Sequence, residues 1–170
     1  RRGLPNIKSM VEAVETLTTD KAVKLFEKFG IFTKAELESR EEILYETYAK
    51  TINIEALTMI NMASKQILPA VIKYTKTLAD TVVAVREAGA AADVQADLLK
   101  EASTLLEEAK KALEVLKRED TKAASMPQGK EQAFYYKDAV KEAMTALRTP
   151  IDALEMIVDK ELWPFPSYGD

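Results

Sequence analysis

The 170-residue sequence contains no cysteine and no histidine. The lack of cysteine excludes disulfides, thiolate-ligated zinc and cysteine nucleophiles. The lack of histidine excludes an imidazole for a Ser-His relay, a His-ligated zinc and the Glu-x-x-His pattern of di-iron bundles. An enzyme made of this chain alone would therefore have to work with carboxylates and lysines.

Glycine and long apolar runs are also scarce. The five glycines never stand within three residues of each other, which excludes a glycine-rich phosphate loop. No uncharged apolar run reaches the ~18 residues of a membrane span, and the chain does not begin with a basic-then-apolar leader. A net charge of -4 and a pI near 5.2 argue against nucleic acid, whose phosphates attract basic patches. We therefore expect a cytoplasmic protein that binds neither nucleic acid nor membrane.

Apolar residues at helical spacing are abundant in the sequence. Residues 50–74 (KTINIEALTMINMASKQILPAVIKY) predict a central helix that is buried on several sides. One apolar series steps by four, three and four and so repeats every eleven residues, which keeps one face of a long helix inward. This series is Ile52, Ala56, Met59, Ala63, Ile67, Ala70, Tyr74, Leu78, Thr81 and Val85. A second series, expected to fill the neighbouring face, is Leu57, Ile60, Leu68, Val71, Ile72 and Val82.

The start of the chain predicts two short helices before the long one. Ser9, followed by Glu12, is expected to cap the first, and Asp20 the second, which should bury Val23, Phe26 and Phe29. Gly30 ends that helix, and a Thr-x-x-Glu capping box at residues 33–36 begins the long helix, which continues to about residue 88. Pro69 predicts a kink or break at residues 65–68.

Two further helices complete the expected fold. Asp93 is expected to cap a helix that runs to about Lys117, and residues 119–130 are expected to form a mobile loop. The stripe of the first helix is Leu98, Ala102, Leu105, Ala109, Ala112 and Leu116, widened by Leu99, Leu106 and Leu113. The last helix, with Val140, Met144, Leu147, Ile151, Leu154 and Val158 on one face, should kink at Pro150 and end near Leu162. The predicted fold is all-α: a bundle of about three long antiparallel helices preceded by two short helices.

Polar residues in the most apolar helix have two open interpretations. Asn53, Glu55, Asn61 and Gln66 could form a buried network that fixes helix register, or could mark a solvent-facing edge. The acidic groups Glu38, Glu41 and Glu42, and Glu107 and Glu108, are interpreted as solvated faces rather than metal or acid-base sites, because lysines are interleaved with them and adjacent helical residues point apart. We predict no catalytic, cofactor-binding or metal-binding residue in this chain.

The aromatic tail contains the only candidate site residues. Trp163, Phe165 and Tyr168 are combined with prolines, which limit the entropy lost on docking. They could cover this chain's own bundle or form an interface with another subunit or domain, since aromatics predominate in interface hot spots.

Several of these segments resemble glutamine synthetases. Residues 50–60 (KTINIEALTMI), 67–70 (ILPA), 163–166 (WPFP) and 168–170 (YGD) resemble the C-terminal region of the type III family. The opening region resembles the end of the catalytic domain in glutamine synthetases generally, through Leu4-Pro5, Glu12-Ala13, Leu17, Asp20, residues 29–32 (FGIF) and Arg40-Glu41. The resemblance implies two parts: residues 1–48, the tail end of the catalytic domain, and residues 49–170, the helical C-terminal domain of the type III family.

The resemblance also implies a function. The family joins ammonia to glutamate at the expense of ATP, with Mg²⁺ or Mn²⁺, in ring-shaped homo-oligomers. Its metal-binding glutamates, its histidine and its phosphate-binding arginines lie in motifs upstream of anything in this sequence. The chain is thus expected to be inactive alone, to bind no cofactor itself, and to brace a missing N-terminal catalytic domain and supply subunit contacts. The alternatives are a free-standing helical protein-protein interaction module and, third, a self-contained carboxylate enzyme.

Overall fold

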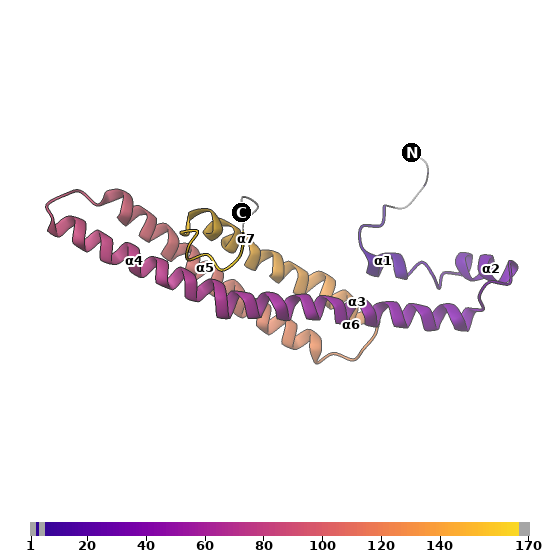
Figure 1. The fold of residues 1–170 in the computed structure, drawn as a ribbon. Coiled ribbons are helices and arrows are strands. Elements are labelled where there is room, and N and C mark those ends of the chain that lie inside the picture. Colours follow the sequence, from indigo (N-terminus) through magenta and orange to yellow (C-terminus); the bar gives the residue numbers. More distant parts are fainter. Residues whose placement is uncertain (1–2, 4–5, 167–170) are drawn as a thin grey trace. The chain divides into compact units, whose positions relative to one another are not determined.

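The computed structural model describes residues 3 and 6–166, and every regular element within them is a helix (Figure 1). The two short helices are α1 (Met10–Val14) and α2 (Asp20–Lys28). Three long helical stretches follow. The first consists of α3 (Lys34–Met62), the π turn η1 (Ala63–Ile67) and α4 (Leu68–Glu87), and the second is α5 (Asp93–Ala124). The third consists of α6 (Lys130–Tyr135), the π turn η2 (Tyr136–Val140) and α7 (Lys141–Ile157). The expected all-α bundle of three long antiparallel helices preceded by two short ones is confirmed.

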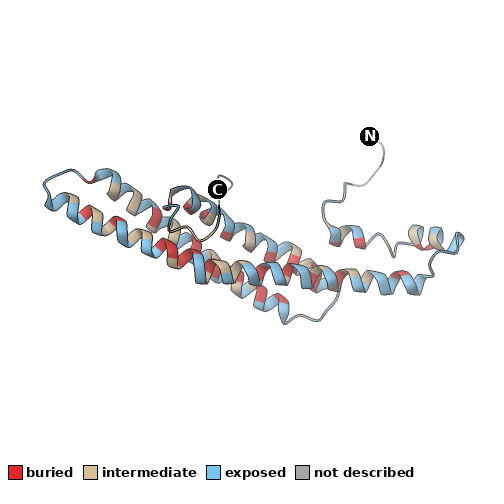
Figure 2. Ribbon diagram, in the orientation of Figure 1, coloured by how far each residue is buried: buried red, intermediate tan, exposed pale blue. Residues whose placement is uncertain are grey.

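The chain divides into two compact units, and each contains segments of all three long helices. Unit 1 comprises residues 1–55 and 120–141, and unit 2 comprises residues 56–119 and 142–170. Buried and exposed residues alternate at a helical spacing along the long helices of both (Figure 2). The core of unit 1 is partly aromatic, with the Tyr45 and Phe134 rings 6.4 Å apart. That of unit 2 is rich in alanine, which lets helix axes approach closely.

Local capping signals explain where the first helices begin. The Thr33 N–H donates to Glu36 Oε2 at 2.7 Å and the Glu36 N–H donates to Thr33 Oγ1 at 3.4 Å, which is the predicted capping box. The predicted cap of α2 was wrong by one residue. Thr19 is the N-cap instead: its Oγ1 accepts the Ala22 N–H at 3.4 Å, and threonine is among the residues that commonly cap helices. Asp20 is the first residue of α2, where its negative charge interacts favourably with the positive N-terminal end of the helix dipole.

One aromatic residue predicted to be buried by α2 is exposed. Val23 is buried and Phe26 is half-buried, but Phe29 is 65% exposed. Phe29 directly precedes Gly30, whose φ of +63° ends the helix as predicted. Phe29 is the C-cap residue, beyond the last turn of α2, whereas Phe26 lies within the helix and packs against the Phe32 ring.

The eleven-residue pattern of the central helix is confirmed. Every member of the first series is buried or half-buried, and Ala56 and Ala63 are almost completely buried. The irregularity predicted near Pro69 is present as a π-helical turn, η1, and the helix is not broken. Proline has no N–H to donate to the carbonyl one turn earlier, and the wider π turn accommodates this missing hydrogen bond. Within the turn, the Leu68 N–H donates to the carbonyl of Ala63, five residues earlier.

The prediction of burial on several sides was wrong for part of the second series. Leu68, Val71 and Val82 are buried, but Leu57 is 50% exposed and Ile72 is 56% exposed. The neighbouring helices of unit 2 cover only part of the circumference of this helix, so apolar residues beyond the eleven-residue stripe remain in contact with solvent.

The second and third long helices differ from the prediction at their ends. Asp93 is the first residue of α5 rather than its cap, since the Ala92 carbonyl accepts the Ala96 N–H at 3.0 Å. The predicted apolar stripe of α5 is buried or half-buried, and α5 continues to Ala124, which shortens the predicted loop to residues 125–129. The last stretch was predicted to kink at Pro150, but it remains helical through this buried proline, and its π turn, η2, lies at residues 136–140. Its final helix, α7, ends at Ile157 rather than near Leu162.

Candidate functional site

Unit 1 contains a buried polar cluster contributed by all three long helices. It consists of Asn53 on α3, Asp120 on α5, Gln132 on α6 and Tyr136 on η2. Asp120 is 5% exposed, and its Oδ1 accepts a hydrogen bond of 3.0 Å from Asn53 Nδ2. Among the described residues, Asp120 and Gln132 are the buried polar or charged side chains. A buried carboxylate needs such a donor, because unpaired burial of a charge is costly.

The electrostatics of the cluster follow from burial. Burial raises the pKa of Asp120, and the hydrogen bond from Asn53 opposes that shift. Burial also raises the pKa of Tyr136, with the nearby negative charge of Asp120 adding to the effect. The cluster therefore favours protons on its acidic groups, and its arrangement is that of a network that joins three helices.

Gln132 extends the cluster to the end of α5. Its Nε2 donates to the Ala123 carbonyl at 3.0 Å and to the Met126 carbonyl at 3.4 Å. The Ala123 carbonyl also accepts the Met126 backbone N–H at 3.2 Å, so the Gln132 amide adds a second hydrogen bond to this carbonyl and ties α6 to the turn that follows α5. The contact therefore links the end of α5 to the start of the third helical stretch.

The polar residues of the central helix were predicted either to form a buried network or to mark a solvent-facing edge, and each prediction holds for some of them. Asn53 joins the buried network, whereas Glu55, Asn61 and Gln66 are exposed. Sequence reasoning missed Asp120, Gln132 and Tyr136. The available signal was that Asp120 continues the buried stripe of α5 (Ala109, Leu113, Leu116, Asp120, Ala123) in alternating steps of four and three.

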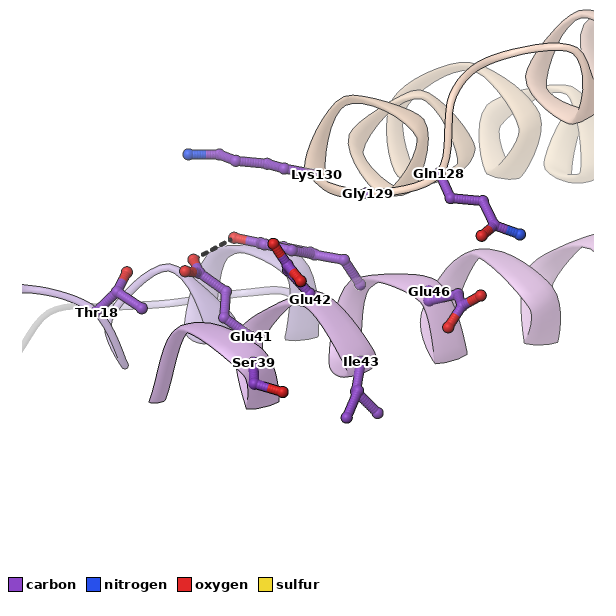
Figure 3. Close-up of a pocket in the computed structure, with 10 residues that line it drawn as sticks. Thr18, Ser39, Glu41, Glu42, Ile43, Glu46, Gln128, Gly129 and Lys130 are labelled. Atoms are coloured by element: carbon purple, nitrogen blue, oxygen red, sulfur yellow. Dashed lines mark hydrogen bonds between the residues drawn. The ribbon is translucent and has the colours of Figure 1, made fainter. Parts of the chain in front are cut away.

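A second feature of unit 1 is an open, mainly polar pocket of about 680 Å³ (Figure 3). Glu41, Glu42 and Glu46 line it from α3, and Gln128 and Lys130 from the segment that leads into α6. The Glu41 carboxylate accepts a hydrogen bond of 3.2 Å from the Tyr45 hydroxyl, drawn as a dashed line in Figure 3. Lys130 pairs with Glu15, with 2.5 Å between Nζ and Oε1; this contact raises the pKa of Lys130, and the negative charge of Glu41 adds to the effect.

The acids predicted to lie on solvated faces behave as predicted, apart from the half-buried Glu41. Glu38, Glu42, Glu107 and Glu108 are exposed, and exposed i, i+4 ion pairs such as Lys34–Glu38 occur along the same helices. Within the described part of the chain, acidic residues form no group of three or more placed to hold a metal ion.

Charged contacts attach α1 to the third helical stretch. Lys137 Nζ lies 2.9 Å from Glu12 Oε1 and 2.9 Å from Asp138 Oδ1, and 5.3 Å from the centre of the Phe134 ring. The Lys137 ammonium lowers the pKa of the Glu12 carboxyl. The Glu12–Lys137 ion pair thus links α1 to η2, next to the core to which α1 contributes Val11 and Val14.

The aromatic tail is half-buried in unit 2. Trp163 and Phe165 are both of intermediate exposure, and the Trp163 N–H donates to the Asp159 carbonyl at 2.9 Å. Tyr168 lies outside the described residues. Part of each described ring is thus left for a further contact, and the interface role of Trp163, Phe165 and Tyr168 stays a prediction.

Across residues 3 and 6–166, no helix combines the length and the apolar character required to cross a membrane.

Comparison with known proteins shows which family the sequence resembles. The model of the glutamine synthetase C-terminal domain matches residues 1–86. Over all of this chain, a glutamine synthetase from Butyrivibrio fibrisolvens is 34% identical, with the match covering 25% of that protein. A type-3 glutamine synthetase from Dictyostelium discoideum is 31% identical over 99% of this chain and 24% of its own length, and a glutamine synthetase from Bacteroides fragilis is 30% identical over 100% and 24%. The chain spans about a quarter of the length of these relatives, at their C-terminal end.

Proposed function

Because this chain belongs to the family of glutamine synthetase C-terminal domains, we propose that it is the helical, non-catalytic C-terminal portion of a type III glutamine synthetase. The observation that carries the proposal is that 99% of the chain aligns with a type-3 glutamine synthetase while covering 24% of that protein. The parent polypeptide would ligate ammonia to glutamate at the expense of ATP, with Mg²⁺ or Mn²⁺, in the cytoplasm. Residues 1–48 would close its catalytic domain and residues 49–170 would form the helical addition.

The role of this portion would be to brace the catalytic domain and to supply contacts between subunits of a homo-oligomer. Long helices joined by a buried polar cluster and by charged contacts form a stiff support. The half-buried Trp163 and Phe165 are available for a contact outside the bundle, and aromatic rings are the residues that contribute most at such interfaces.

The test is an assay of glutamine formation from glutamate, ammonia, ATP and Mg²⁺. The 170-residue chain is expected to give no turnover, whereas the full polypeptide is expected to be active. Removal of residues 49–170 from the full polypeptide is expected to disrupt its assembly, measured by sedimentation, and with it the activity. Turnover by the 170-residue chain, or an inactive full polypeptide, would contradict the proposal.

A second function is favoured by the exposed apolar side chains of the central helix in unit 2. Leu57, Ile72 and Val83 are each at least 50% exposed, as expected for a free-standing module that binds another protein through this helix. The mass of the native polypeptide that contains this sequence separates the two functions. A mass several times 19.0 kDa supports the synthetase, and a mass of 19.0 kDa supports the interaction module.

A further inference from the structure

An apolar surface lies on α2 and on the turn that follows it. It consists of Leu25, Phe29 and Ile31, which are 53%, 65% and 56% exposed, and which we call the α2 face. Leu25 and Phe29 are four residues apart and therefore lie on the same side of the helix. Single exposed apolar residues are ordinary, but several large ones within one short segment mark an interaction surface.

The same segment also forms an apolar hollow of about 350 Å³. Its walls come from the turn between α1 and α2, from α2, from the turn before α3 and from α3 itself: Leu17, Phe26, Phe32, Leu37, Arg40, Ile43 and Leu44. The Phe26 and Phe32 rings are 5.7 Å apart, and the Arg40 guanidinium lies 4.2 Å from the centre of the Phe32 ring. Ile43, on the rim, is 57% exposed. Aromatic walls held in this way can accept an apolar side chain from outside.

We propose that the α2 face and this hollow bind apolar side chains of the preceding catalytic portion of the same polypeptide, an inference that rests on the proposed function. The relatives are about four times as long as this chain, and the match lies at their C-terminal end. The missing three quarters would therefore join the chain at residue 1, which precedes the start of α1 by nine residues and the start of α2 by nineteen.

The size of the surface favours this occupant over a second copy of the chain. Stable complexes between separate chains bury roughly 800 Å² on each partner, which is more than three side chains supply. A covalently attached partner needs less, because its effective concentration is on the order of millimolar. A small apolar surface close to the point of attachment is what an intramolecular contact requires.

Thiol labelling tests the contact, since the 170 residues contain no cysteine. Phe29→Cys would be made in the 170-residue chain and in the full polypeptide, and its maleimide labelling would be followed by mass spectrometry of the peptide that contains residue 29. Glu27→Cys is the matched control, because Glu27 is an exposed residue of the same helix on another side. Thiol reactivity follows access, so labelling at residue 29 should be at least about tenfold slower in the full polypeptide, with residue 27 unchanged.

Three results would overturn the proposal. Equal rates at residue 29 in the two proteins would show that the surface stays open. Equal slowing at residues 27 and 29 would show that all of α2 is enclosed rather than this face. Labelling at residue 29 that slows as the 170-residue chain forms dimers in sedimentation experiments would assign the surface to a second copy.

The same protein preparations distinguish this inference from the proposed function. If the full polypeptide forms glutamine and residue 29 labels freely, only the docking surface is wrong. If it forms no glutamine, the proposed function fails whatever the labelling shows. Phe29→Asp supplies an independent check: it should leave the melting temperature of the 170-residue chain unchanged but lower that of the full polypeptide, and equal melting behaviour in both would contradict the contact.

Discussion

Asn53 donates a hydrogen bond of 3.0 Å from its Nδ2 to Oδ1 of Asp120, a residue 67 positions later in the chain. The bond joins α3 to α5 within unit 1, beside the buried Tyr136. It gives a buried carboxyl its hydrogen-bond partner and specifies which face of α5 packs against α3. The contact should affect the free energy of unfolding of this chain and the way in which that free energy depends on pH.

Loss of the Asn53 amide should destabilise the fold. Asn53→Ala leaves the Asp120 carboxyl buried without its donor, which should lower the free energy of unfolding by about 1–3 kcal/mol in urea denaturation. Asn61→Ala is the control, because Asn61 is an exposed asparagine on the same helix and its replacement should change stability by less than about 0.5 kcal/mol. Equal effects of the two substitutions would show that the hydrogen bond contributes nothing.

The buried carboxyl predicts a specific pH dependence. Burial raises the pKa of Asp120 above its ordinary value of 3.8, so the folded state holds the proton more tightly than the unfolded state does. The stability that comes from this group is therefore complete below pH ~3.8 and is lost as the pH rises through the folded pKa. Denaturation of the parent chain and of Asp120→Asn should be compared between pH 3.5 and pH 7. The stability of the parent relative to the variant should fall as pH rises, and a difference that stays flat or grows would contradict the prediction.

A charge placed in the alanine-rich core should unfold unit 2. Ala63 is 1% exposed and begins the π turn, so Ala63→Glu buries an unpaired carboxylate and should cost at least about 3 kcal/mol. Asn61→Glu adds the same charge two residues earlier at an exposed position and should leave the melting temperature nearly unchanged. Circular dichroism melting curves of both variants provide the measurement. An unaltered melting temperature for Ala63→Glu would show that the buried face is wrongly placed.

The tail tryptophan reports on the proposed interface. Trp163 is the single tryptophan of the sequence and is half-buried, so acrylamide should quench its fluorescence partially in the 170-residue chain. In the assembled parent polypeptide, a contact with another body should make it less accessible and shift its emission to the blue. Trp163→Phe in the same polypeptide allows the signal of any other tryptophans to be subtracted. Identical quenching of Trp163 in the two proteins would mean that the tail serves only its own bundle.

The fold was predictable where the signals are local or periodic. The capping box of Thr33 and Glu36 involves residues three apart, and the eleven-residue stripe through Ala56 and Ala63 needs only a helix and one partner surface. The irregularity near Pro69 follows from the missing N–H of proline. Such features are properties of the chain itself, and the structure confirms all of them.

The polar cluster was not predictable in the same way. A polar residue on an apolar stripe can lie at a break in the stripe or be buried against a partner, and the sequence around Asp120 reads equally well as a loop. The outcome depends on which helices meet and in which register. Here the Asn53 amide donates to Asp120, Gln132 donates to the carbonyls of Ala123 and Met126, and α5 continues through Asp120 to Ala124.

The sequence by itself determined the helical class, the inward face of each long helix, the position of the proline irregularity and the likeness to the glutamine synthetase family. Only the tertiary structure decided that Asn53 is paired while Asn61 is solvated, that Phe29 is exposed, and where α5 ends. The physical reason is the range of the interactions involved. Helix periodicity and capping operate over three to eleven residues, whereas burial of a polar or aromatic side chain depends on surfaces contributed by segments far away in the chain.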